Sequence, residues 1–283
     1  MKILITGANS FVGSSVERWL LREPEKYEID TVDTVGDNWR KADLSLYDAV
    51  FHVAGLAHVD PKPEMAPLYY KVNCDLALEI ARAAREAGVG QFIFMSSMIV
   101  FRASKSLKGT AITHETEPAP NDFYGDSKLR AEIGLRKLET PDFKVAVLRP
   151  CMIYGPGNKG NFPRLARLAA RTPVFPAWHN RRSMLYIDNL SEFVRQALDR
   201  RLSGTFHLQN REYADTVELV RALGRQANHS IFISRLFNPL VRVAAPFLKP
   251  VSKMFADQYY DSSLTDYPFE YQLVSLEESL SRL

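Results

Sequence analysis

The stretch KILITGANSFVG, residues 2–13, decides the fold. It begins with a short apolar run, continues into a turn with Gly7 and Gly13, and leads into the helix-like sequence SSVERWLLRE. Gly7 permits a tight turn, and Gly13 allows the helix to pack closely on the strand. Ser10 replaces the middle glycine and is small enough to let a phosphate approach the backbone. Strand, glycine turn and helix in this order predict a dinucleotide-binding arrangement.

Asp33 ends the next apolar run, EIDTVD, and stands 20 residues after Gly13. At that spacing an acid binds the hydroxyls of the adenosine ribose in dinucleotide-binding folds. A carboxylate would repel a 2′-phosphate, and no arginine follows Asp33 directly, so the sequence favours NAD over NADP. The alternative is an ordinary turn of a parallel sheet with a chance acid beside it.

Strands and helices alternate along the first half of the chain. This predicts an α/β fold, a Rossmann-type doubly wound parallel sheet with a smaller C-terminal substrate lobe. Between Asp33 and Ala49 the chain is too short for a full crossover, so the usual third strand and helix should be trimmed. The expected strands are Lys2–Thr6, Glu28–Asp33, Ala49–Ala54, Gln91–Ser97 and Lys144–Arg149, and the expected helices are Ser14–Arg22, Asn73–Ala87 and Tyr124–Leu138.

The alternation ends after Arg149, where Gly155-Pro156-Gly157 forms a turn cluster. We expect residues 1–155 to form the NAD-binding domain, with 185–208 packing on it. Residues 156–184 and 209–283 should form the substrate-binding lobe. Further helices are expected at Asn161–Arg171, Ile187–Arg200 and Thr216–Ala227, and a short strand at Phe206–Leu208.

A second informative pattern lies between residues 92 and 128. The run FIFMSSMIVF places Ser96 and Ser97 at the end of an expected strand, and the helical sequence YGDSK follows a polar loop. Tyr124 and Lys128 are four residues apart and share one helix face. A phenol beside an ammonium loses its proton more easily, which predicts a general base that works near neutral pH. The alternatives are a surface Tyr–Lys pair and serines that only hydrogen-bond at a strand end.

Composition and charge exclude several classes of protein. The net charge of +3 is too small to indicate a nucleic-acid partner, and it suits a small anionic substrate. Cys74 and Cys151 have no metal-binding spacing and are expected to be buried, reduced thiols of a cytoplasmic protein. Met1 leads straight into a strand, so we expect no signal peptide. No apolar run reaches the length of a transmembrane helix.

The segment 231–255 is apolar with interspersed basic residues, and three prolines divide it into short pieces. One interpretation is a lid over the substrate or a packing face. The other is a basic amphipathic surface for a membrane or a lipid-linked substrate. The prolines count against a continuous helix and therefore against the second interpretation.

Together these residues resemble the extended short-chain dehydrogenase/reductases. More narrowly they resemble the NAD-dependent epimerase/dehydratase family, and within it the UDP-glucose 4-epimerases. The resemblance runs from Lys2 to about Asn210, and its segments follow the family's order. They are TGANSFVG, Asp33, FHVAGLAHVD, the Asn73 region, FIFMSSMIVF, YGDSK, LRPCMIYGPG and RRSMLYIDNL.

The resemblance implies a catalytic role for Ser97, Tyr124 and Lys128. Ser97 would hydrogen-bond a sugar hydroxyl, Tyr124 would take its proton, and Lys128 would hold the tyrosinate and the nicotinamide ribose. The implied cofactor is NAD, bound by Gly7, Asn9, Ser10, Phe11, Val12, Gly13, Asp33, Ala54, Gly55, Ala57, Asn73, Ser96, Tyr124, Lys128 and Pro150. His58 follows FHVAGLA, where the family places a residue near the cofactor.

The implied substrate is a nucleotide sugar. Arg182 matches the family's diphosphate-binding arginine, Asn161 and Phe162 match the helix start at the nucleotide base, and Ser97 and Met152 would line the sugar. The alternative for Arg182 is a solvated charge. The resemblance also implies a homodimer, a cytoplasmic location and a role in polysaccharide biosynthesis.

The sequence leaves three functions open. The first is an NAD-dependent nucleotide-sugar epimerase, and the second is a reductase of nucleotide-linked 4-keto sugars. Two positions depart from the epimerase pattern: Met152 stands where epimerases carry an asparagine that touches the sugar, and the family's second diphosphate-binding arginine is not evident in FADQYYDSSLTDY. The third is a catalytically idle NAD-binding regulator. Met98-Ile99 replaces the acid pair of dehydratases, so 4,6-dehydration is not expected.

Overall fold

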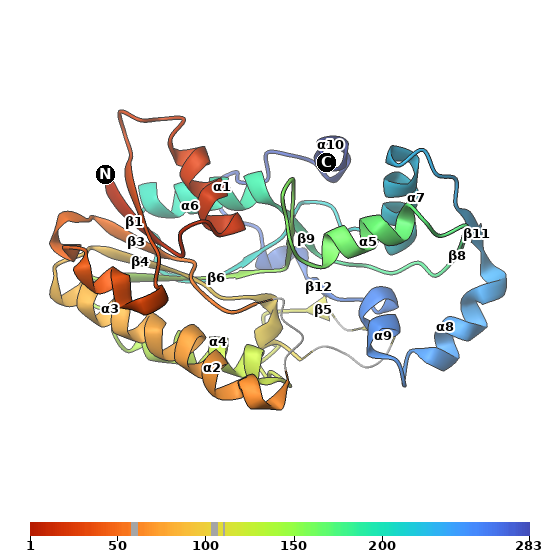
Figure 1. Cartoon of the computed structure of the whole chain (residues 1–283), viewed down its shortest axis with the longest axis horizontal. Coiled ribbons are helices and arrows are strands. Elements are labelled where there is room, and N and C mark those ends of the chain that lie inside the picture. The colour runs from red at the N-terminus through yellow and green to blue at the C-terminus, as the bar shows by residue number, and fades with distance from the viewer. Residues whose placement is uncertain (58–61, 103–106, 110) are drawn as a thin grey trace.

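The computed structural model describes residues 1–57, 62–102, 107–109 and 111–283. Its centre is a six-stranded parallel sheet with the order β10-β6-β4-β3-β1-β2 (Figure 1). This sheet confirms the predicted α/β fold class. The strands are β1 (Lys2–Thr6), β2 (Glu28–Val32), β3 (Ala49–His52), β4 (Gln91–Met95), β6 (Lys144–Pro150) and β10 (Gly204–Leu208).

Helices cover both faces of the sheet (Figure 1). On one face lie α1 (Phe11–Leu20) and α6 (Ile187–Asp199), and on the other lie α2 (Ala66–Tyr70), α3 (Leu76–Glu86) and α4 (Phe123–Arg136). Successive strand residues point to opposite faces: Ile3 and Ile5 belong to one buried cluster, and Leu4 belongs to the other. Burial on both faces explains why the inner strands β1, β3, β4 and β6 are largely apolar, whereas the edge strands β2 and β10 are less buried and more polar.

Two local predictions need comment. The helix expected to begin at Asn73 begins earlier, because α2 continues through a π-helical turn, Lys71–Asp75, into α3. The expected trimming between β2 and β3 is confirmed, since this stretch holds only two 3₁₀ helices, Val35–Lys41 and Leu44–Leu46.

A smaller lobe follows at the end of the sheet that carries the carboxyl termini of the strands (Figure 1). It includes two small parallel sheets, β11-β8 and β7-β9, and a third pair, β12-β5, lies nearby. The remaining strands and helices of the chain are β5 (Ala111–Ile112), β7 (Met152–Tyr154), α5 (Asn161–Ala169), β8 (Val174–Pro176), β9 (Met184–Tyr186), α7 (Thr216–Gln226), β11 (Phe232–Ser234), α8 (Asn238–Ala244), α9 (Lys249–Phe255), β12 (Tyr259–Tyr260) and α10 (Leu276–Ser281). Short 3₁₀ turns lie at Pro63–Met65, Met98–Val100, Arg235–Phe237 and Ser262–Leu264.

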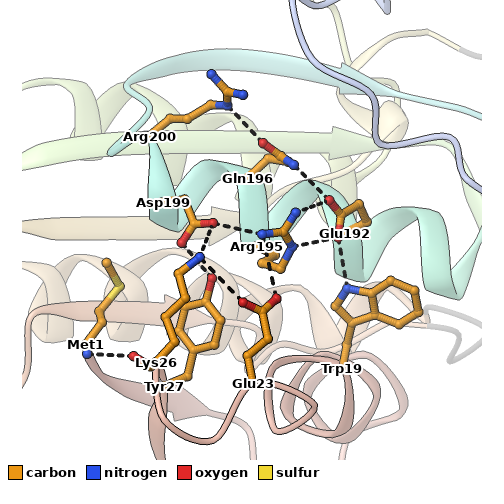
Figure 2. Close-up of polar contacts among 10 residues, drawn as sticks. All are labelled: Met1, Trp19, Glu23, Lys26, Tyr27, Glu192, Arg195, Gln196, Asp199 and Arg200. Atoms are coloured by element: carbon orange, nitrogen blue, oxygen red, sulfur yellow. Dashed lines mark hydrogen bonds and ion pairs between the residues drawn. The ribbon is translucent and has the colours of Figure 1, made fainter.

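The segment 185–208 lies with the first half of the chain. Its strand β10 pairs with β6 at the edge of the sheet, and α6 packs on α1. Figure 2 shows the polar contacts between these parts. Glu192 accepts from Trp19 Nε1 at 3.1 Å and from Arg195 Nε at 2.8 Å, and Asp199 accepts from Tyr27 at 2.6 Å and Lys26 at 2.7 Å. The boundary of the substrate lobe itself stays a prediction.

Glu192→Ala is expected to lower the free energy of unfolding by about 2 kcal/mol, because Arg195 and Trp19 lose a buried acceptor. Urea denaturation followed by circular dichroism measures the change. Glu270→Ala is the control: its partner Arg211 lies 3.2 Å away and both side chains are exposed, so the loss should stay below about 1 kcal/mol. Equal losses in the two variants would contradict this account.

Candidate active site

The glycine turn lies at the carboxyl edge of the sheet. Gly7 has φ +92°, and a Cβ there would lie 2.9 Å from the backbone nitrogen of Ala54, at the end of β3. Only glycine fits this contact, because both the dihedral and the space exclude a side chain. Since β1 lies between β2 and β3, this is the point where the strand order reverses. Ligands of open parallel sheets bind at such a point.

The start of α1 explains the serine in place of the middle glycine. Ser10 is the N-cap residue, and its hydroxyl accepts a hydrogen bond of 3.0 Å from the backbone N–H of Gly13. The N–H groups of Phe11 and Val12 belong to the first helical turn, whose donors have no acceptor within a helix. Together with Asn9, at φ 62°, the turn presents backbone donors suited to a pyrophosphate.

Asp33 follows β2 at the same edge, and its side chain is exposed. Oδ1 accepts a hydrogen bond of 2.9 Å from the N–H of Val35, which holds the carboxylate in place. An exposed, oriented carboxylate beside the glycine turn suits the hydroxyls of a ribose.

Gly55, Asn73 and Lys128 come together beyond the end of β3. A methyl group on Gly55 would lie 3.0 Å from Asn73 Oδ1 and 3.2 Å from Lys128 Nζ. Asn73 is fully buried in the π-helical turn, where Oδ1 accepts from Leu56 N at 2.8 Å and Nδ2 donates to Ser127 Oγ at 3.2 Å. Glycine therefore keeps the space beside this amide and ammonium open. Ala54 is buried, Ala57 is half-buried, and His58 lies outside the described residues.

Lys128 is buried on α4, with only 5% of its surface exposed. Its Nζ donates to the carbonyl of Met95 at 2.8 Å and lies 4.7 Å from the centre of the Phe94 ring. Burial lowers the pKa of Lys128 to about 8, partly opposed by Glu132. The Lys128 amine is thus held at the carboxyl end of β4, and with a pKa of about 8 it loses its proton slightly above neutral pH.

Ser97 and Tyr124 meet at the same edge. Ser97 Oγ accepts from the N–H of Ile99 at 3.2 Å, and the same side chain lies beside the Tyr124 hydroxyl, close enough to affect its pKa. Burial raises the pKa of Tyr124 to about 12; Tyr69 and Asp122 also raise it, and the neighbouring Ser97 side chain lowers it. We expected the neighbouring ammonium of Lys128 to lower the pKa of Tyr124. That expectation is wrong, because the desolvation of the buried phenol dominates.

Ser96 hydrogen-bonds to a buried ion pair, Glu132 with Arg149, that was not predicted from the sequence. Its hydroxyl donates to Glu132, and Arg149 Nη2 lies 2.6 Å from the same carboxylate. Arg149 also approaches His207 at 3.4 Å, and burial together with this arginine lowers the pKa of His207 to about 4. The signal was present, since Glu132 stands four residues after Lys128 on one buried helix face.

The residues expected to bind the substrate lie around the end of β6. Pro150 is buried there, and Met152 follows on β7, half-buried. Asn161 is exposed at the start of α5, whereas the ring of Phe162 is buried and stacks on Tyr154 at 5.0 Å. The side chain of Phe162 is therefore committed to the core, which leaves its backbone for a ligand.

Arg182 lies between the two parts of the small lobe. Its guanidinium donates to the carbonyl of Lys253, and its charge partly opposes the burial that raises the pKa of the Cys151 thiol, just after β6. Burial lowers the pKa of this guanidinium, which nonetheless stays charged. A half-buried arginine that faces a carbonyl retains donors for an anion.

Comparison with known proteins identifies the family. Residues 3–208 match the NAD dependent epimerase/dehydratase family, and the chain belongs to it. It is an enzyme, and NAD is its cofactor, as the sequence predicted. The glycine turn and the space beside Gly55 fit such a dinucleotide.

Two characterised relatives and one solved structure are informative. The UDP-glucose 4-epimerase of Vibrio cholerae is 31% identical over 244 residues, which cover 78% of this chain and 74% of that protein. An N-acetyl-alpha-D-glucosaminyl-diphospho-ditrans,octacis-undecaprenol 4-epimerase of Escherichia coli O157:H7 is 25% identical, over 93% of this chain and 83% of that protein. The UDP-glucose 4-epimerase of Thermus thermophilus in complex with NAD superposes with a TM-score of 0.74 at 20% identity, over 100% of this chain and 97% of that chain, which shows the fold.

Proposed function

We propose that this chain is an NAD-dependent sugar epimerase that acts on a nucleotide sugar, most like a UDP-glucose 4-epimerase. The observation that carries the proposal is that Ser97 and Tyr124 lie beside each other at the carboxyl edge, with Lys128 one turn further along α4. The similarity to the Vibrio cholerae enzyme supports the same reaction. A proton and a hydride must leave one carbinol together, so a base and a cofactor ring must lie on either side of it.

Each catalytic residue has a distinct proposed role. Ser97 orients the sugar hydroxyl by a hydrogen bond, and Tyr124 accepts its proton. Lys128 holds the nicotinamide ribose and stabilises the tyrosinate once its ammonium turns from the Met95 carbonyl. NAD supplies the hydride acceptor and, after the ketone has turned over, the donor. Epimerisation therefore requires a cofactor that stays bound and a pocket in which the ketone can turn.

The proposed cofactor contacts divide by part of the dinucleotide. The pyrophosphate lies on the glycine turn, the adenosine ribose on Asp33, and the nicotinamide half near the ends of β3, β4 and β6. The residues are Gly7, Asn9, Ser10, Phe11, Val12, Gly13, Asp33, Ala54, Gly55, Ala57, Asn73, Ser96, Tyr124, Lys128 and Pro150. Since the hydroxyl of Ser96 bonds Glu132, Ser96 would act through its backbone or by positioning β4.

Arg182 is proposed to bind the diphosphate of the substrate, with Met152, Asn161 and the backbone of Phe162 around the sugar and base. The diphosphate carries a nucleotide in the name of one relative and an undecaprenol in that of the other. A homodimer and a cytoplasmic location stay predictions. Within the described residues no helix combines the length and apolar character that a membrane span needs.

Two measurements test the function. The absorbance of the purified protein after gel filtration shows whether it retains NAD(H), and a panel of UDP-, dTDP- and GDP-sugars with an undecaprenol-diphosphate sugar, resolved by NMR, identifies the product. Retained cofactor with an inverted sugar supports the epimerase. Net consumption of NAD(P)H on a 4-keto sugar, for which Met152 gives some support, would replace it with a reductase. Bound NAD with no turnover would indicate a regulator.

Asp33→Ala is expected to lower the preference for NAD over NADP by roughly ten- to a hundredfold, because a charge-assisted hydrogen bond to the ribose and the repulsion of a 2′-phosphate are both lost. Binding titrations with the two dinucleotides measure the ratio. Asp48→Ala is the control, since Asp48 accepts from the N–H of Lys2 at the opposite, amino end of the strands. An unchanged ratio in Asp33→Ala would remove Asp33 from the cofactor site.

A further inference from the structure

An exposed apolar ridge runs along the outer side of the small lobe. It consists of Leu236, Leu240, Val243 and Phe247, which are spaced four, three and four residues apart: Leu236 lies in the 3₁₀ turn Arg235–Phe237, Leu240 and Val243 lie in α8, and Phe247 lies in the turn that follows α8. This spacing places Leu240 and Val243 on one face of α8, and Leu236 and Phe247 extend the ridge at its two ends. Their surfaces are 79%, 64%, 67% and 82% exposed. On the opposite face Val241 and Ala245 are only 5% and 3% exposed.

The ridge is therefore the outer side of a segment, α8 with its flanking turns, whose inner side already packs on the protein. Figure 1 shows α8 at the far end of the small lobe, away from the six-stranded sheet. A helix on a protein surface normally turns polar residues to the solvent. Several large apolar side chains gathered on one outward face instead mark a binding surface.

The charge around the ridge is of one sign. From His229 to Ala256 the sequence contains four Lys or Arg residues and no Asp or Glu. Arg235, Arg242 and Lys253 are exposed. Arg235 and Arg242 stand seven residues apart, two helical turns, so they form a row beside the ridge. An apolar ridge with a basic flank matches a surface that is apolar within and anionic at its border.

We propose that the ridge docks the protein on the surface of an anionic lipid bilayer. The side chains of Leu236, Leu240, Val243 and Phe247 would enter the boundary between headgroups and acyl chains, while Arg235 and Arg242 would pair with lipid phosphates. This is how an amphipathic helix that lies in the interface binds, without spanning the bilayer. The proposal does not depend on the epimerase reaction.

The prolines that seemed to count against this surface do not. Pro239 lies in the first turn of α8, where its missing N–H would have no intrahelical acceptor. Pro250 occupies the same kind of position in α9. Pro246 follows the end of α8. The prolines therefore set where the helices begin and end, and the ridge remains continuous in space.

A second copy of this chain fits the ridge less well than a bilayer. A twofold contact brings the same patch from both copies together, so the row of Arg235 and Arg242 would face cationic residues of the same kind. A lid over the substrate is also disfavoured, because the ridge faces away from the lobe that Val241 and Ala245 contact. An anionic bilayer satisfies both the apolar and the basic side chains.

The ridge is connected to the proposed site through α9. The guanidinium of Arg182 donates to the carbonyl of Lys253 in this helix, which follows the ridge directly in the chain. Docking would hold the small lobe, with Arg182, at the bilayer. If the proposed function is correct, a diphosphate carried on a lipid could then reach the site from the membrane.

Flotation of the full-length protein with lipid vesicles tests the proposal. Binding is expected to vesicles with roughly 30 mol % phosphatidylglycerol in phosphatidylcholine, to weaken as salt is raised, and to be much weaker on phosphatidylcholine alone. The double variant Leu240→Ser/Phe247→Ser should reduce the partition coefficient roughly tenfold or more. Leu21→Ser/Leu46→Ser, at exposed leucines remote from the ridge, should leave it unchanged.

A charge variant separates docking from loss of fold. Arg235→Glu/Arg242→Glu should lose binding to anionic vesicles while its circular dichroism spectrum and NAD affinity match those of the wild type. Absence of wild-type binding to anionic vesicles would overturn the proposal, as would equal binding by wild type and both ridge variants. Loss of a dimer in the ridge variants, seen by analytical ultracentrifugation without wild-type vesicle binding, would assign the ridge to self-association instead. Because flotation needs no turnover, it can fail or succeed independently of the proposed reaction.

Discussion

Tyr124→Phe is expected to lower the turnover number about a thousandfold while the affinity for NAD changes little. The substitution removes the one hydroxyl that the proposed mechanism uses as a base. It keeps the ring, which packs edge-on against Tyr69 at a centroid distance of 5.8 Å. The fold and the glycine turn should therefore be unaffected, so the loss falls on proton transfer alone.

The raised pKa of Tyr124 sharpens this prediction. With a pKa of about 12, the phenol is protonated at neutral pH, so proton transfer requires a nearby cation to stabilise the phenolate. Lys128 stands four residues along the same helix and would supply that charge. The activity of the wild type should accordingly rise with pH below the apparent pKa of the pair, and this rise should vanish in the residual activity of Tyr124→Phe.

Steady-state kinetics and NAD titration by fluorescence provide the measurement. Tyr70→Phe is a matched control, because it also removes one tyrosine hydroxyl. The Tyr70 hydroxyl donates to Asp126, in the first turn of α4, at 2.7 Å. It should retain most of the activity. A near-normal rate in Tyr124→Phe would remove this residue from the mechanism, and a similar loss in both variants would indicate a structural effect.

Lys128→Met is expected to lower turnover by at least a hundredfold and to weaken NAD binding, because one side chain serves both the base and the ribose. Methionine has similar length and fills the buried space without a charge. Asn73 and Ser127, which lie beside Lys128, should keep their hydrogen bond. The two effects on binding and turnover distinguish this variant from Tyr124→Phe, which should lower turnover with little change in NAD affinity.

The same variant has a signature in stability. The pKa of Lys128 is about 8 in the folded protein and 10.5 in an ordinary lysine, so between these values the unfolded chain binds a proton that the folded chain does not. Stability therefore rises with pH across this window, and below pH 8 the full cost of burying the ammonium is present. The rise should be on the order of 3 kcal/mol and should be absent in Lys128→Met.

Urea denaturation of wild type and Lys128→Met at pH 7 and pH 10 tests this linkage. The contributions of the other titrating groups are the same in both proteins, so they cancel when the two changes in the free energy of unfolding are subtracted. Lys137→Met is the control: this exposed lysine at the end of α4 should leave the pH dependence of the wild type intact. If Lys128→Met also left the pH dependence unchanged, the ammonium would not be buried as the structure has it.

The fold could be predicted because its signals are local. Period and composition located β1, β2, β3, β4 and β6 to within two residues, since an inner parallel strand, buried on both faces, has a short apolar sequence; β2, at the edge, is more polar. Boundaries failed where tertiary packing overrides propensity. The helix expected at Asn73 begins at Ala66, because its π-helical turn is what brings the buried Asn73 amide against Leu56.

The candidate site was only partly predictable. Ser97, Tyr124 and Lys128 were identified because a helix repeat and a strand end bring them to one edge. The ion pair of Glu132 with Arg149 was missed, since its partners lie on different elements that only the fold brings together. The roles of the catalytic, cofactor and substrate residues stay predictions until the variants above are measured.

The sequence by itself determined the order of strands and helices, the glycine turn and the residue types at the carboxyl edge, because these depend on short-range geometry. Only the tertiary structure decided the electrostatics and the surface. Burial, which depends on what packs around a group, raised the pKa of Tyr124, lowered that of Lys128 and left the ridge of Leu236 to Phe247 facing outward. Desolvation and exposure are properties of the assembled molecule, and no local pattern of residues specifies them.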